Sequence, residues 1–354
     1  MKYVRALCTV GLMAMMTLSV FADDESKEEA KPQGTPATVE AQTVLDGLDN
    51  PCAVAIQPET GDIFVSDSGA GRIIRVVDGK AQDVITDFPG DVYGKGPMYN
   101  IGPLGLGFIS KDILVVGGGG QKDGDELLRV YKVPEKGAEP IKADAMEASF
   151  KLEATDEIKG EGNFYAVAVG KNAVYVTANG DDTKGWVAKA TINGTKVEKF
   201  ERFLPTKEKT EVDAPVGITM HDLGYVVVGQ LGEITVPGDA LLTFYDDKGE
   251  MLMNLETGLS DITAVAYSTQ PRGKSNKKQL YVLDFSWHDT SQGGLFQLVA
   301  DGEDGVEARK KTGLDKPTSM AFAADGSLYI TVIGTAEEGS DAKPGKLLKV
   351  EPGL

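Results

Sequence analysis

Residues 47–55 read Gly-Leu-Asp-Asn-Pro-Cys-Ala-Val-Ala, and nearly the same phrase returns at residues 258–266 and 313–321. A looser copy begins at Asp213. These later copies start about 50 residues apart, which is the period of a chain that repeats one supersecondary unit. Each copy leads from a Gly or Pro turn into small and β-branched residues, and a second apolar run follows it. The unit is therefore predicted to be a small antiparallel sheet of consecutive strands.

Six such units fit into the chain, and five of them hold four short apolar runs separated by turn residues. The sixth unit stops one strand short, after residues 346–350. Residues 37–44, ahead of the first unit, form an isolated strand-like segment with no other partner. We therefore predict an all-β fold, a six-bladed β-propeller with four-stranded antiparallel blades, in which the N-terminal strand closes the last blade. Closure of this kind leaves only short, protected sheet edges.

The first residues have the pattern of a signal peptide. Lys2 and Arg5 precede an apolar run over residues 6–21, and small residues around Ala22 match the positions that a signal peptidase reads. We expect cleavage after Ala22 and export to the periplasm or the extracellular space. The run is short for a membrane span, and no later segment replaces it.

The rest of the chain is predicted to hold one domain. Residues 23–36 are charged and contain Pro, which is typical of a solvated spacer, and residues 37–354 form the single propeller. Cys52 is the only cysteine after the signal peptide, so no intrachain disulfide can form. The ring must then be closed by strand pairing.

The charge balance excludes two classes of partner. Asp and Glu number 54 against 36 Lys and Arg, which gives a formal net charge of −18. Nucleic acids and anionic membrane surfaces are bound through clustered Lys and Arg, so neither is expected as a partner. Cations, cationic partners or solubility alone are compatible with this acidity.

One motif links the chain to a known type of propeller. Residues 61–73, Gly-Asp-Ile-Phe-Val-Ser-Asp-Ser-Gly-Ala-Gly-Arg-Ile, resemble an NHL repeat, and Tyr281-Val282-Leu283-Asp284 keeps part of that pattern. Over roughly residues 40–350 the chain is similar to six-bladed propellers of the NHL and senescence-marker-protein (gluconolactonase-like) type. This resemblance concerns the fold and does not by itself define the chemistry.

One face of the disc is expected to carry the functional loops. The connections that open on it are long and hold many carboxylates and aromatic residues, whereas the other face has tight turns. Rigid scaffolds commonly place binding residues on such loops. We expect a small molecule, a polysaccharide or a protein to bind there, and the candidate contacts are Trp287, His288, Trp186 and Tyr99.

Residues just before the innermost strands are expected to converge at the mouth of the central channel. Their oxygen-bearing side chains suit calcium or another divalent cation, and the predicted ligands are Asp49, Asn163, Asp213 and Asp261. The resemblance implies one metal that polarises a lactone and activates water. Asn163 and Asp261 are similar to that family's ligands, but residues 49–51, Asp-Asn-Pro, replace its glutamate. The alternative is that these residues cap strands and turns.

Other catalytic groups are scarce. The chain has two histidines, His221 and His288, and no Gly-x-Ser-x-Gly motif, so a nucleophilic triad has little support. The glycine run at residues 117–120 opens no helix, and no organic cofactor is indicated.

Two function classes follow from these observations. The favoured one is an extracytoplasmic binding module that presents an acidic, aromatic-bearing face. The alternative is a metal-dependent hydrolase of lactones or related esters. The replaced glutamate and the scarcity of general bases favour the first, and whether the chain is an enzyme stays open.

Overall fold

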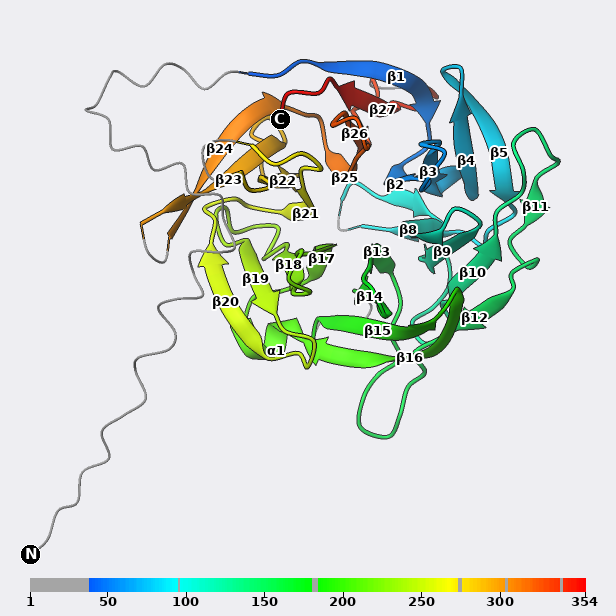
Figure 1. Ribbon diagram of the computed structural model, residues 1–354, viewed down its shortest axis with the longest axis horizontal. Helices are drawn as coiled ribbons and strands as arrows, with labels where there is room; N and C mark the ends of the chain where they lie inside the picture. The colour runs from blue at the N-terminus through cyan, green and yellow to red at the C-terminus, as the bar shows by residue number, and fades with distance from the viewer. Residues whose placement is uncertain (1–37, 95, 180–183, 273–275, 303–304, 338–339) are drawn as a thin grey trace, which may run out of the picture.

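The computed structural model describes residues 38–354 except residues 95, 180–183, 273–275, 303–304 and 338–339. The predicted signal peptide and spacer lie outside the described residues. Six sheets surround a central axis, and the last strand of the chain shares a sheet with β1 (Figure 1). The predicted six-bladed, almost all-β propeller is confirmed. Among the described residues, the one α-helix, α1 (Thr206–Thr210), is far too short to cross a membrane.

Blades 1 to 3 each contain four antiparallel strands in sequence order. Blade 1 consists of β2 (Pro51–Ile56), β3 (Ile63–Asp67), β4 (Arg72–Val77) and β5 (Lys80–Thr86), and β11 (Ile141–Lys142) pairs parallel to β5. Blade 2 consists of β8 (Pro103–Ser110), β9 (Ile113–Gly118), β10 (Leu128–Lys132) and β12 (Ala148–Phe150). Blade 3 consists of β13 (Phe164–Val169), β14 (Ala173–Ala178), β15 (Trp186–Asn193) and β16 (Lys196–Pro205).

Blades 4 and 5 repeat this arrangement, and in blade 6 the fourth strand comes from the start of the propeller. Blade 4 consists of β17 (Pro215–Met220), β18 (Val226–Gln230), β19 (Leu241–Tyr245) and β20 (Met251–Glu256). Blade 5 consists of β21 (Ile262–Tyr267), β22 (Leu280–Asp284), β23 (Gly294–Asp301) and β24 (Gly305–Gly313). Blade 6 consists of β25 (Pro317–Phe322), β26 (Leu328–Val332), β27 (Gly345–Val350) and β1 (Ala41–Leu48). One further hairpin, β6 (Asp91–Tyr93) with β7 (Tyr99–Ile101), connects blades 1 and 2.

The N-terminal strand closes blade 6, as predicted, but with shifted bounds. β1 pairs antiparallel with β27, from Ala41 opposite Val350 to Leu48 opposite Gly345. It therefore runs four residues further than the predicted 37–44. A Cβ on Gly345 would lie 2.5 Å from the Leu48 carbonyl oxygen, so only glycine allows the two strands to approach this closely.

The hydrophobic core lies between adjacent blades. Val227 and Leu242 of blade 4, for example, pack with Leu280 and Val282 of blade 5. Because each sheet is covered on both faces, its middle strands read as continuous apolar runs, and periodicity alone cannot tell which face a side chain occupies.

Candidate functional site

A cavity of about 170 Å³ lies at the mouth of the central channel. The second residue of every innermost strand contributes to its wall: Cys52, Leu104, Tyr165, Val216, Thr263 and Thr318. Loops from several blades complete the wall above this ring. Burial raises the pKa of the Cys52 thiol to about 12, so this side chain is a neutral lining group and not a thiolate.

Tyr165 forms the floor of the cavity. Its hydroxyl donates a hydrogen bond of 3.3 Å to the carbonyl oxygen of Thr318. The two residues belong to blades 3 and 6, which face each other across the ring (Figure 1), so the tyrosine crosses the channel. A second cavity of about 70 Å³ lies on the other side, and Tyr165 lines both. Its burial raises the phenol pKa, so the group stays a neutral donor.

Aromatic side chains from distant parts of the chain form one wall. Trp287 stacks on Phe285 with ring centroids 4.9 Å apart, and its ring meets Tyr99 edge-on at 6.0 Å. All three line the cavity, together with Tyr93 from the β6–β7 hairpin. The pKa of Tyr99 rises to about 12, first because of burial and then because of the negative charge of Asp315, so its hydroxyl is also a neutral donor.

Two buried aspartates hold the loop that carries Trp287. Asp284 accepts hydrogen bonds from the backbone N–H groups of Asp261 (2.8 Å) and Ser286 (3.0 Å). Asp261, which is 1% exposed, in turn accepts one from the backbone N–H of Trp287. Burial, then repulsion from Asp284 and Asp239, raises the pKa of Asp261 to about 6, although the Trp287 hydrogen bond opposes the rise. Asp261 therefore positions Trp287 without lining the cavity itself.

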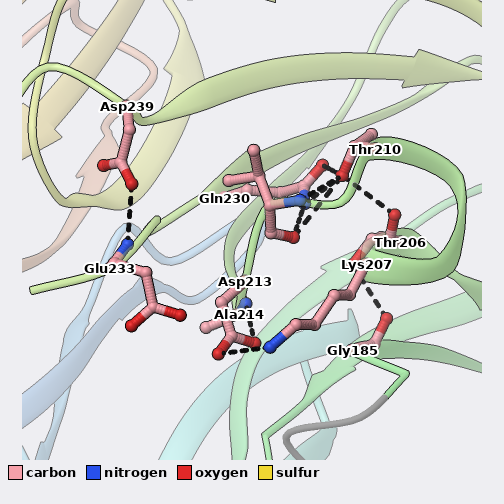
Figure 2. Close-up of polar contacts among 10 residues, drawn as sticks. Gly185, Thr206, Lys207, Thr210, Asp213, Ala214, Gln230, Glu233 and Asp239 are labelled. Atoms are coloured by element: carbon pink, nitrogen blue, oxygen red, sulfur yellow. Dashed lines mark hydrogen bonds and ion pairs between the residues drawn. The ribbon is translucent and has the colours of Figure 1, made fainter. Parts of the chain in front are cut away.

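Blade 4 supplies the two carboxylates of the cavity wall, Asp213 and Glu233. Figure 2 shows both, with Lys207 of α1 forming an ion pair of 2.9 Å with Asp213. The backbone N–H of Glu233 donates to Asp239 at 2.9 Å. That aspartate packs against Gly232, where a Cβ would lie 2.2 Å from its Oδ1 and φ is +81°, so glycine is required there.

Gln230 fixes the segment that precedes Asp213. Its amide nitrogen donates to the carbonyl oxygen of Val212 at 2.7 Å and to the Thr210 hydroxyl at 2.9 Å (Figure 2). The side chain is fully buried at the end of β18. This network ties the carboxylate wall to the rigid sheet of blade 4.

Two asparagines line the cavity in the left-handed backbone conformation that precedes an inner strand. Asn50 has φ +49° and Asn163 has φ +45°. The Asn50 amide nitrogen donates to the Asn100 carbonyl oxygen at 2.8 Å, whereas its Oδ1 is buried and has no partner among the described residues. The hydroxyl of Tyr99 is likewise buried without a described partner. Such groups are unusual unless a ligand or water completes them.

The structure brings two of the four predicted metal ligands, Asn163 and Asp213, to the cavity. Asp49 instead forms an ion pair of 2.8 Å with Lys343, and Asp261 binds the backbone of Trp287. In the described part of the chain, no three His, Cys, Asp or Glu side chains are arranged to hold a metal ion. The metal site remains a prediction.

Two of the four predicted ligand contacts lie at the cavity. Trp287 and Tyr99 lie together in the cavity wall. His288 is exposed on the same loop and does not line the cavity, and Trp186 is 9% exposed within the core of blade 3. Phe285, Glu233 and Asn50 also line the cavity, although none of them was among the predicted contacts or metal ligands.

The comparisons with known proteins concern the fold. No family model and no curated protein matches the chain. Among solved structures, the PQQ-bound aldose sugar dehydrogenase of Streptomyces coelicolor is 15% identical with a TM-score of 0.55, over 90% of this chain and 99% of that one. An oxidoreductase described as a putative glucose dehydrogenase, from Thermus thermophilus, is 18% identical with a TM-score of 0.57, over 88% and 99%. A putative gluconolactonase is 12% identical with a TM-score of 0.51, over 89% and 93%. At such identities the likeness establishes the propeller architecture alone.

Proposed function

We propose that the protein is an exported binding module that holds a small organic molecule in the channel-mouth cavity. The observation that carries this proposal is the aromatic wall of Trp287, Phe285 and Tyr99 beside the Oδ1 of Asn50, which has no partner among the described residues. Concave sites with an apolar wall and a few fixed polar groups are typical of small-molecule binding. Export is inferred from the pattern around Lys2, Arg5 and Ala22.

The lining side chains favour binding over nucleophilic catalysis. No histidine is among the described residues of the wall, and Cys52 stays a thiol because its pKa is about 12. The hydroxyls of Thr263 and Thr318 donate to the backbone carbonyls of Pro317 and Pro51. In the part of the chain that the structure describes, none of these groups has the adjacent base that activates a nucleophile.

The cofactor of the Streptomyces neighbour does not fit this cavity. PQQ is a quinone that carries several carboxylates, whereas the wall presents the carboxylates of Asp213 and Glu233. The described residues place no Lys, Arg or His in the wall to balance such a ligand. The cavity of about 170 Å³ is also small for a fused tricyclic molecule.

Hydrolysis of lactones is the second candidate, and the meeting of Asn163 and Asp213 at the cavity favours it. A divalent ion bound there would polarise the carbonyl of the substrate. Calcium takes roughly six to eight oxygen ligands, however, and the Lys207 ion pair already engages Asp213. The side chains at the wall do not complete such a set, so we place hydrolysis second.

The two tryptophans provide the test. In a Trp186→Phe variant of the mature chain, Trp287 is the only indole, so its fluorescence reports the cavity alone. We expect quenching or a spectral shift by at least one member of a panel of monosaccharides, lactones and small amines. Lactone hydrolysis is measured in parallel, with and without a chelator. Chelator-sensitive turnover that is lost in Asp213→Asn would replace the binding proposal by the hydrolase, and no response of Trp287 to any compound would refute it.

A further inference from the structure

If the cavity binds a ligand, as proposed above, the charges around it define the class of that ligand. Asp213 and Glu233 are the charged side chains among the described residues of the wall. Asp213 is compensated by Lys207 at 2.9 Å. Glu233 is exposed, and the described residues give it no ion pair, so a negative charge remains at the rim of the cavity.

Two other lysines in the described part of the chain near the mouth, Lys343 and Lys316, are already engaged. Lys343 pairs with Asp49 at 2.8 Å. Lys316 donates to the carbonyl oxygen of Gly334 at 3.3 Å and to the hydroxyl of Thr335 at 3.0 Å. Neither lysine lines the cavity. An anionic ligand would therefore meet Glu233 without a compensating charge from the described residues, whereas a cation would be attracted.

The uncharged groups of the wall also favour a positively charged ligand. The rings of Trp287, Phe285 and Tyr99 line the cavity, and the ring faces that the Trp287–Phe285 stack leaves open carry negative potential, which attracts cations. The Oδ1 of Asn50, in a residue that is 7% exposed, is an acceptor that lacks a described partner. A protonated amine would donate an N–H to it and would also be attracted by the carboxylate of Glu233, which a ligand offering only acceptors would not.

The cavity also limits the size. Its volume of about 170 Å³ is below the roughly 300 Å³ at which pockets for drug-sized ligands begin. We propose that the protein binds a small organic ammonium compound, with the charged nitrogen directed toward Glu233 and Asn50 and the carbon skeleton against Trp287 and Tyr99.

Choline and dimethylbutanol are the probes for this proposal. They have nearly the same shape, but the alcohol carries an uncharged tert-butyl group in place of the trimethylammonium. In the mature Trp186→Phe protein, we expect choline to change Trp287 fluorescence with a Kd about tenfold lower than that of dimethylbutanol. Added salt should weaken choline binding and leave dimethylbutanol unaffected, because only the former is attracted by charge.

A matched pair of variants locates the charge. Glu233→Gln should raise the Kd of choline about threefold or more and leave that of dimethylbutanol unchanged. Glu256→Gln removes the same charge from an exposed position of β20 and should change neither Kd. Far-ultraviolet circular dichroism and Tm establish that both variants are folded.

The outcomes separate the two proposals. Equal Kd values for choline and dimethylbutanol, or binding of glucose without binding of choline, would overturn the ammonium inference and leave the binding module standing. Equal effects of Glu233→Gln and Glu256→Gln would also overturn it, because the attraction would then come from the overall charge. No response of Trp287 to choline, dimethylbutanol, glucose or the lactone panel would refute the binding function as well.

Discussion

Closure of the ring can be tested at one side chain, Leu48. Of the side chains of β1 only this one is fully buried, at 1% exposure, and it packs with Val54, Val65, Ile74 and Leu347. Those neighbours belong to blades 1 and 6, so Leu48 joins the first blade to the last. Leu48→Ala perturbs this junction without deleting any of the strand pairing.

The expected loss follows from the number of buried carbon atoms. Leu→Ala removes three carbon groups, and each buried group contributes about 0.8 kcal/mol, which gives about 2.4 kcal/mol. A cavity that does not collapse raises the cost of such a substitution to as much as about 5 kcal/mol. We expect Leu48→Ala to lower the free energy of unfolding by about 3 kcal/mol. Leu45→Ala, in the same strand at a half-buried position, should cost about 1 kcal/mol.

Urea unfolding of the mature chain, followed by circular dichroism, measures both variants against the wild type. The slope of the free energy against urea should be unchanged, so that the midpoint reports stability. If Leu48→Ala costs no more than Leu45→Ala, the junction between the first and last blades does not carry the stability that its burial implies.

Three further predictions concern the cavity. Asp261 has a folded-state pKa of about 6, above its ordinary 3.8, so between these pH values the folded state holds a proton on this carboxyl that the unfolded state has lost. The protein therefore loses stability as the pH rises through 6 and the buried carboxyl becomes charged. Asp261→Asn should therefore stabilise the protein at pH 8 by about 1 to 3 kcal/mol and change little at pH 4, and an equal gain at both pH values would contradict this. Trp287→Ala should raise the Kd of choline, measured by calorimetry, at least tenfold, while His288→Ala changes it less than twofold because that side chain lies outside the wall. Tyr165→Phe removes the hydrogen bond to Thr318 and should lower the free energy of unfolding in urea by about 0.5 to 1.5 kcal/mol. Equal stability of the variant and the wild type would show that this hydrogen bond does not stabilise the fold.

The fold could be predicted because the strands of each blade follow one another along the chain. Every turn and apolar run then has a local sequence signal, and the phrase at residues 47–55 fixes the register of the unit. The end of β1 was placed too early because Gly47 and Leu48 belong both to the repeated phrase and to the closing strand, where Leu48 pairs with Gly345. That pairing is a contact between the two ends of the chain, which no local signal contains.

The cavity could be predicted only in part, because its wall depends on which way side chains point. Trp186 begins β15, a strand buried on both faces, and lies between blades instead of at the mouth. Tyr99 meets Trp287 only because the β6–β7 hairpin lies over the channel mouth, where the Asn50 amide bonds the carbonyl oxygen of Asn100. Neither arrangement follows from periodicity.

The polar residues of the repeat have two different roles, which the structure separates. Asp67 ends the second strand of blade 1 and accepts a hydrogen bond of 2.7 Å from the backbone N–H of Asp49. Asp284 ends the second strand of blade 5 and accepts from the backbone N–H groups of Ser260 and Asp261, at the same position of the repeat.

In blades 1 and 5 a buried carboxylate of the same blade therefore holds the turn into the inner strand, whereas in blade 6 the equivalent position, opposite Pro317, is Val332. The cavity wall, by contrast, also uses loop residues whose type changes from blade to blade, namely Trp287, Tyr99 and Glu233. Acidic residues that recur with the unit are therefore expected to affect stability when they are replaced, and those that break the pattern to affect binding.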